Sequence, residues 1–200
     1  MRDVGDWVGY NTAEAIARRE RRKRSVWEKR AELIANFDVI HGHFIADKYL
    51  GFTSEMDFIA FFREPYQQIV SAFEYVLRNP QQVDHPAVAA FHEQSMSLMD
   101  FVTWEDRGNV QAEMLGSVPL EDLAMVGISE QFDQSVALFN ATFKRDLKPN
   151  SPLNVNPDRP GSRYEVDPEI LKAVKRYRAE DLDVYRRACE LFEAQCARRL

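Results

Sequence analysis

Length, composition and charge together favour a single soluble globular domain. The chain has 200 residues, of which 45% are hydrophobic and 29% charged, as is typical of a domain that buries a core. A formal net charge of −6 argues against a general nucleic-acid binder, and no apolar run approaches the roughly 18–20 residues that cross a bilayer. The start, MRDVGDW, lacks the apolar core of a signal peptide. We therefore expect a cytoplasmic protein without a nucleic-acid or membrane partner.

The first 36 residues are predicted to form a tail and a basic helix. From Thr12 to Asn36 apolar residues recur at helical spacing, and Thr12 is suited to the N-cap position. Residues 18–24 read RRERRKR. A solvated helix face is the ordinary interpretation of such a run, with nucleic-acid binding or the steering of an anionic glycan as alternatives.

Residues 37–200 are predicted to form the core of this one domain, with α/β architecture. FDVIHGHF (residues 37–44) is a short apolar run of strand type, and AMVGI (124–128) reads as a buried strand. DFIAFF (57–62) is the strongest strand prediction, an apolar run suited to burial on both faces. Such alternation with helices indicates a mainly parallel sheet flanked by helices. We expect helices at 65–78, two or three between 86 and 115 with a break near 106–108, then at 130–143, 168–177 and 180–199.

The two cysteines and four histidines give no case for a disulfide or a metal site. Cys189 and Cys196 are seven residues apart on one predicted helix, so their Cα atoms would lie roughly 10 Å apart, beyond disulfide reach. We interpret both as reduced thiols. The histidines lack an accompanying ligand pattern.

The segment FFREPYQQIVSAFEY, residues 61–75, is predicted to form a phosphate-binding site. A buried strand would present Arg63 at its C-terminal end, where open α/β sheets bind ligands. Pro65 is suited to the first position of a helix, whose free N–H groups would face the same point, and Ser71 adds a hydroxyl. The alternative is that Arg63 only forms a structural salt bridge and Ser71 is an ordinary helix residue.

The same segment resembles the 3′-phosphate-binding motif of sulfotransferases, Arg-x-Pro-x-x-Arg-x-x-Ser-x-Tyr/Phe. Arg63, Pro65, Ser71 and Phe73 match it, and Gln68 replaces the second arginine. The resemblance implies that Arg63 and Ser71 hold the 3′-phosphate of the co-substrate 3′-phosphoadenosine 5′-phosphosulfate.

The triplet His41-Gly42-His43 is the second candidate site. A glycine permits close approach of the backbone to a ligand, and histidine has a pKa suited to a general base; a purely structural histidine is the alternative. The triplet resembles that of uronyl 2-O-sulfotransferases and their bacterial relatives. This implies that His43 is the catalytic base and that His41 assists or positions it.

Later segments are similar to the same family and occur in its order, so that the resemblance covers residues 37–192. They are Gly108–Gly116, Val126–Phe132, the loop from Leu153 to Arg163, and Asp181-x-x-x-Tyr185. The family resemblance implies a P-loop-like sulfotransferase fold, a carbohydrate-like acceptor and no metal. It also implies that the loop contacts the nucleotide through Asn154, Arg159 and Arg163, with solvated loop arginines as the alternative.

The N-terminal strand and loop with which sulfotransferases bind the 5′-phosphosulfate, of the type Pro-Lys-x-Gly-Thr-Ser/Thr, are not found. The early glycines are Gly5 and Gly9, without that pattern. We expect a truncated reading frame of an enzyme first, and a pseudoenzyme or a chain completed by a partner second. Strand 57–62 would then have an open neighbour position. The two functional hypotheses are a sulfotransferase and a non-catalytic nucleotide- or sulfated-glycan-binding protein.

Overall fold

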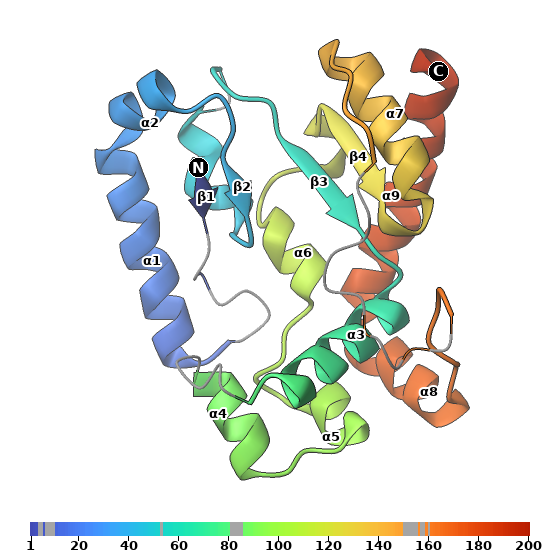
Figure 1. Cartoon of the computed structure of the whole chain (residues 1–200). Helices are drawn as coiled ribbons and strands as arrows, with labels where there is room; N and C mark the ends of the chain where they lie inside the picture. Colours follow the sequence, from blue (N-terminus) through green and yellow to red (C-terminus); the bar gives the residue numbers. More distant parts are fainter. Residues whose placement is uncertain are drawn as a thin grey trace.

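The computed structural model of the chain shows short parallel strands within a mainly helical, mixed α/β fold (Figure 1). It describes residues 1–3, 6, 11–52, 54–80, 86–149, 156, 159 and 161–200. The predicted α/β class and the parallel pairing are confirmed. The described strands form two separate pairs rather than one sheet. No helix in these ranges is both long enough and apolar enough to span a bilayer.

The first strand pair joins the start of the chain to the histidine triplet. Strand β1 (Arg2–Asp3) runs parallel to β2 (His41–Gly42), with Arg2 opposite His41 and Asp3 opposite Gly42. The run 37–44 is thus a strand only over His41–Gly42. The residues expected to be a tail supply the partner strand.

The predicted basic helix is confirmed as two helices, α1 (Ala13–Glu28) and α2 (Arg30–Asn36), which meet at Lys29. The Thr12 hydroxyl accepts a hydrogen bond from the Ala15 N–H at 3.2 Å, as an N-cap residue does. A 3-10 helix, η1 (Ala46–Phe52), packs against α1.

The second strand pair leads into the helix that follows Arg63. Strand β3 (Ile59–Phe62) runs parallel to β4 (Met125–Ile128), with Phe62 opposite Ile128. Helix α3 (Pro65–Arg78) begins at Pro65 as predicted, because the Glu64 carboxylate accepts hydrogen bonds from the N–H groups of Tyr66 and Gln67.

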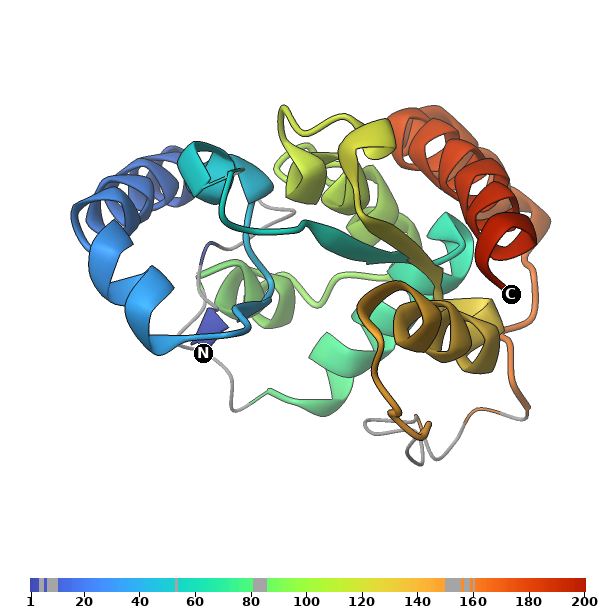
Figure 2. The ribbon, with the colours of Figure 1, turned by 90° about the horizontal axis from the view of Figure 1, so that it is seen from above.

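The prediction that the run 57–62 is buried on both faces is wrong. Phe62 is 2% exposed, whereas Ile59 and Phe61 on the other face of the strand are 39% and 44% exposed. Figure 2 shows helices α7 (Phe132–Phe143) and α9 (Ala179–Arg199) on opposite sides of β4. On the exposed face of β3, Phe132 of α7 contacts Phe61, with the two ring centroids 6.2 Å apart. Among the described residues, β4 is the only strand that pairs with β3.

The remaining helices were predicted in number and place and surround a second part of the core. Helices α3, α5 and α8 pack together around Ile69, Phe101 and Val174, while α9 covers β4 through Phe192. The bounds are α4 (Pro86–Glu93), α5 (Leu98–Thr103), α6 (Val110–Leu115) and α8 (Pro168–Tyr177).

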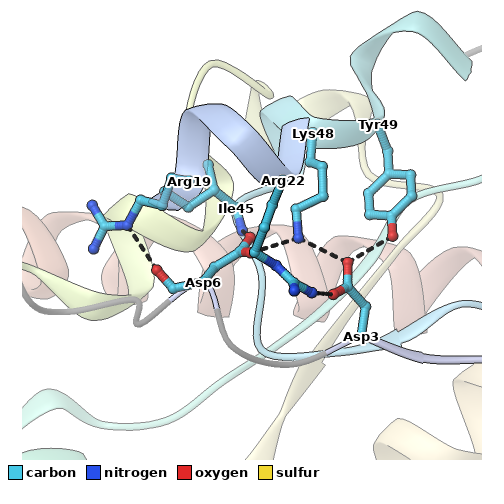
Figure 3. A network of polar contacts seen from close by, with 7 residues as sticks. All are labelled: Asp3, Asp6, Arg19, Arg22, Ile45, Lys48 and Tyr49. Atoms are coloured by element: carbon cyan, nitrogen blue, oxygen red, sulfur yellow. Dashed lines mark hydrogen bonds and ion pairs between the residues drawn. The ribbon is translucent and has the colours of Figure 1, made fainter. Parts of the chain in front are cut away.

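A buried cluster of charges fixes the N-terminal residues against α1 and η1 (Figure 3). Lys48 Nζ lies 2.8 Å from Asp3 Oδ2 and 2.6 Å from Asp6 Oδ1, and Arg22 forms ion pairs with both carboxylates. The Tyr49 hydroxyl donates to Asp3 Oδ2 at 2.7 Å. Lys48, Asp3 and Asp6 are buried. The two negative charges are therefore balanced by two positive ones.

Replacing Lys48 with methionine is expected to lower the free energy of unfolding by about 3 kcal/mol, because it leaves two buried carboxylates with one cation. Urea titration followed by circular dichroism measures this loss. The control is Arg186→Met, which removes ion pairs to Asp183 and Glu190 on the exposed face of α9 and should have little effect. Equal losses in both variants would contradict a special role for the buried cluster.

Candidate phosphate-binding site

Arg63 lies half-buried at the C-terminal end of β3, immediately before α3, as the sequence predicts. The helix N-terminus itself is not free. The N–H groups of Tyr66 and Gln67 donate to the Glu64 carboxylate, at 3.2 and 2.8 Å. The expectation that free N–H groups of α3 face a ligand is therefore wrong, because Glu64 occupies them. The guanidinium of Arg63 is the group at this point that can bind an anion.

Two side chains hold the backbone of the turn between β3 and α3. The Arg63 N–H donates to Gln111 Oε1 at 2.7 Å, and Gln111 Nε2 donates to the Arg63 carbonyl oxygen at 2.9 Å. The Glu64 N–H donates to Glu130 Oε1 at 3.0 Å. Partly buried backbone groups that leave a strand need such partners. Gln111 and Glu130 therefore fix the backbone from which the Arg63 side chain extends.

The start of α9 holds the backbone of Gln111 and the side chain of Glu130. Asp181 Oδ1 accepts hydrogen bonds from the N–H groups of Gln111 and Ala112, both at 2.9 Å. The Tyr185 hydroxyl donates to Glu130 Oε2 at 3.2 Å. Three segments that the sequence analysis singled out, around residues 111, 130 and 181–185, thus converge on the turn at Arg63. Their bracing contacts were not predicted.

The Arg63 guanidinium has no hydrogen bond or ion pair with any part of the chain that the structure describes. Burial lowers its pKa, Glu130 partly offsets this, and Arg159 lowers the pKa further. Arg159 lies beside Tyr164, with its guanidinium carbon 5.4 Å from the ring centroid, and its Nε donates to the Gly161 carbonyl oxygen at 2.8 Å. Two guanidinium groups that influence one another and form no ion pair with a carboxylate among the described residues suit an anion with several oxygens.

Hydrogen bonds to α3 hold the backbone of Tyr164 and Glu165, and the Arg159 guanidinium lies over the Tyr164 ring. The Gln67 side chain donates to the Tyr164 carbonyl oxygen at 3.0 Å and accepts from the Tyr164 N–H at 2.7 Å. The Tyr66 hydroxyl donates to the Glu165 carbonyl oxygen at 3.0 Å. Sequence reasoning missed Tyr66 and Gln67. Their position directly after Pro65 was the available signal, but it does not reveal the partner segment.

No hydrogen bond or ion pair among the described residues joins the other residues predicted to bind the nucleotide to Arg63. Ser71 is half-buried in the second turn of α3, and its hydroxyl makes no hydrogen bond with a described residue. Arg163 is exposed. Asn154 lies outside the described residues. Among the predicted cofactor-binding residues, Arg159 is the one whose charge acts on the pKa of Arg63.

The two histidines belong to the other strand pair and its end: His41 is in β2 and His43 directly follows it. His41 and His43 are exposed, and neither ring has a hydrogen-bond partner within the described ranges. The intervening Gly42 has φ +155°, and a Cβ atom there would lie 1.6 Å from the Asp3 carbonyl oxygen. Glycine is needed here because β1 passes close by, which is a structural reason rather than the ligand contact expected from the sequence. No described hydrogen bond links β2 to the turn at Arg63.

Comparison with family models, with curated proteins and with solved structures gives no match for this chain. The function of the site has to be argued from its own chemistry.

Asp181 is the most perturbed carboxyl group near the site. It is 2% exposed, and burial raises its pKa to about 6 although the N–H groups of Ala112 and Gln111 oppose the shift. Arg178, one turn earlier, is buried too, and burial lowers its pKa to about 10. Asp181 therefore changes charge near pH 6 while it holds the start of α6.

The raised pKa of Asp181 predicts a loss of stability with rising pH. The stabilising contribution of the neutral group is complete below about pH 4 and is lost as the pH rises through about 6. It amounts to about 3 kcal/mol. Urea midpoints between pH 4 and pH 7 should show this decline in the native chain and a flatter profile for Asp181→Asn. Asp183→Asn, on the exposed face of α9, is the control and should run parallel to the native chain.

Proposed function

We propose that Arg63 and Arg159 bind the 3′-phosphate of 3′-phosphoadenosine 5′-phosphosulfate, and that the protein is a sulfotransferase with a P-loop-like fold. The acceptor in this proposal is a hydroxyl group of a carbohydrate-like molecule. The observation that carries the proposal is the half-buried guanidinium of Arg63, which forms no hydrogen bond or ion pair with a described residue and whose pKa is lowered by burial and by the second guanidinium of Arg159, with Glu130 acting in the opposite direction.

A phosphate monoester fits this arrangement on chemical grounds. Guanidinium groups bind phosphate oxygens through two parallel hydrogen bonds, and these bonds strengthen where water is partly excluded. A phosphate dianion would offset the mutual repulsion of Arg63 and Arg159. The choice of a 3′-phosphoadenosine nucleotide rests on the resemblance of Arg63, Pro65, Ser71 and Phe73 to the sulfotransferase motif.

In the proposed reaction His43 accepts the proton of the acceptor hydroxyl, and the hydroxyl oxygen attacks the sulfur atom. The bond between sulfur and the bridging oxygen of the 5′-phosphosulfate breaks, and 3′-phosphoadenosine 5′-phosphate leaves. The exposed ring of His43 is open to an acceptor, and His41 would assist or orient it. Arg63 and Arg159 hold the nucleotide and take no part in proton transfer.

A second candidate function is a non-catalytic protein that binds a nucleotide or a sulfated glycan. The observation that favours it is the separation of the two predicted half-sites. His43 follows β2, whereas Arg63 follows β3, and these strands belong to different pairs. Binding and catalysis therefore need separate tests.

Binding is tested by titrating 3′-phosphoadenosine 5′-phosphate into the 200-residue chain by calorimetry. Arg63→Ala is expected to weaken the affinity at least tenfold, because it removes charge-assisted hydrogen bonds to the 3′-phosphate. The matched control is Arg78→Ala at the other end of α3, where the guanidinium contacts only the Glu74 carbonyl oxygen among the described residues. Unchanged binding in Arg63→Ala, or none by the folded native chain, would refute the nucleotide site.

Catalysis is tested by supplying the phosphosulfate donor with a panel of uronic-acid and other carbohydrate acceptors. His43→Ala is expected to lower the rate of sulfuryl transfer by about 10²–10⁴-fold, as loss of a general base does, while the affinity for 3′-phosphoadenosine 5′-phosphate stays unchanged. The control is His92→Ala, whose ring lies 3.1 Å from the Val76 carbonyl oxygen in a structural setting. Nucleotide binding without transfer to any acceptor would favour the non-catalytic alternative.

A further inference from the structure

The hydrogen bonds around the turn after β3 give Gln111 a role that its sequence position does not suggest. We propose that Gln111, held in place by Asp181, is a positioning residue that fixes Arg63 and thereby makes the site select nucleotides with a 3′-phosphate over those without one. This inference rests on the proposed binding of the nucleotide by Arg63.

Gln111 determines the position of Arg63 because it binds both backbone polar groups of that residue. Its Oε1 accepts from the Arg63 N–H at 2.7 Å and its Nε2 donates to the Arg63 carbonyl oxygen at 2.9 Å. Gln111 is buried, with 6% of its surface exposed. The Arg63 guanidinium has no partner of its own among the described residues, so the direction of its side chain depends on the backbone that Gln111 holds.

Asp181 determines the position of Gln111 in turn. Its Oδ1 accepts from the N–H groups of the second and third residues of α6, Gln111 and Ala112. The charged groups that act on Asp181 are Arg107, Glu113 and Arg178, from the segment before α6, from α6 and from the start of α9. A buried contact from α9 therefore reaches Arg63 through one intermediate side chain.

The chain contains a matched control for this role. The Gln195 side chain also bridges two backbone groups of the core, since its Oε1 accepts from the Val126 N–H at 2.9 Å and its Nε2 donates to the Leu123 carbonyl oxygen at 3.4 Å. It binds the backbone of β4 and of the residue two before it, and among the described residues it makes no hydrogen bond with the turn at Arg63. The same substitution at Gln111 and at Gln195 removes the same kind of bridge from the same protein.

The experiment measures the affinities of the native chain, Gln111→Met, Gln195→Met and Arg63→Ala for two probes. These are 3′-phosphoadenosine 5′-phosphate and adenosine 5′-phosphate, which lacks the 3′-phosphate. Gln111→Met should lower the ratio of the two affinities about tenfold, as expected when a charge-assisted bond is lost. Gln195→Met should leave the ratio unchanged. If Gln111→Met does not fold, Gln111→Asn replaces it, since that side chain is too short to reach both backbone groups.

The outcomes separate this inference from the proposal on which it rests. A ratio that falls in Arg63→Ala but not in the folded Gln111 variant would overturn the positioning role and leave the nucleotide site intact. Equal losses of the ratio in Gln111→Met and Gln195→Met would assign the effect to general destabilisation and also overturn it. A ratio that is unchanged in Arg63→Ala would remove the nucleotide site and the positioning role together.

Discussion

The turn from β3 into α3 depends on hydrogen bonds from side chains, because its backbone N–H groups have no backbone partner in a described strand or helix. The chain passes from extended to helical backbone within Arg63 and Glu64, and both N–H groups there are met by side chains, from Gln111 and Glu130. Each of those side chains arrives on a different element, and α9 anchors both through Asp181 and Tyr185. The packing of α9 on β4 is therefore what allows the turn to keep its form.

The charges of Lys48 and Arg63 differ in whether carboxylates of the chain form ion pairs with them. Lys48 is enclosed by two carboxylates, so that the cluster around it satisfies its own charges and holds the start of the chain in place. Arg63 is half-buried, and the charges of Glu130 and of a second cation, Arg159, act on it, but no carboxylate among the described residues forms an ion pair with it. The charges of the first arrangement satisfy one another, whereas the second is the arrangement on which the proposed anion site rests.

Local sequence patterns predicted most of the helices. The features that the sequence did not predict depend on contacts between residues far apart in the chain. The start of α3 at Pro65 follows from residues within one turn, and so does Thr12 as an N-cap. The pairing of residues 2–3 with β2 carries no pattern because two residues are too few to show one. The exposed face of β3 was missed because an apolar run does not say whether a second layer covers it. The bridge from Gln111 to Arg63 joins residues 48 apart in sequence, and no spacing rule relates them. The roles of His41, His43 and Asn154 stay predictions.

The anchoring of the turn by α9 also affects how the protein folds while the ribosome synthesises it. Synthesis proceeds from the N-terminus, so β3, α6 and β4 leave the exit tunnel before α9 does. Until α9 has emerged, Gln111 lacks Asp181, Glu130 lacks Tyr185, and one face of β4 is uncovered. A nascent chain paused before that helix would expose strands that are prone to aggregation, and the backbone of Arg63 would lack the contacts that fix it.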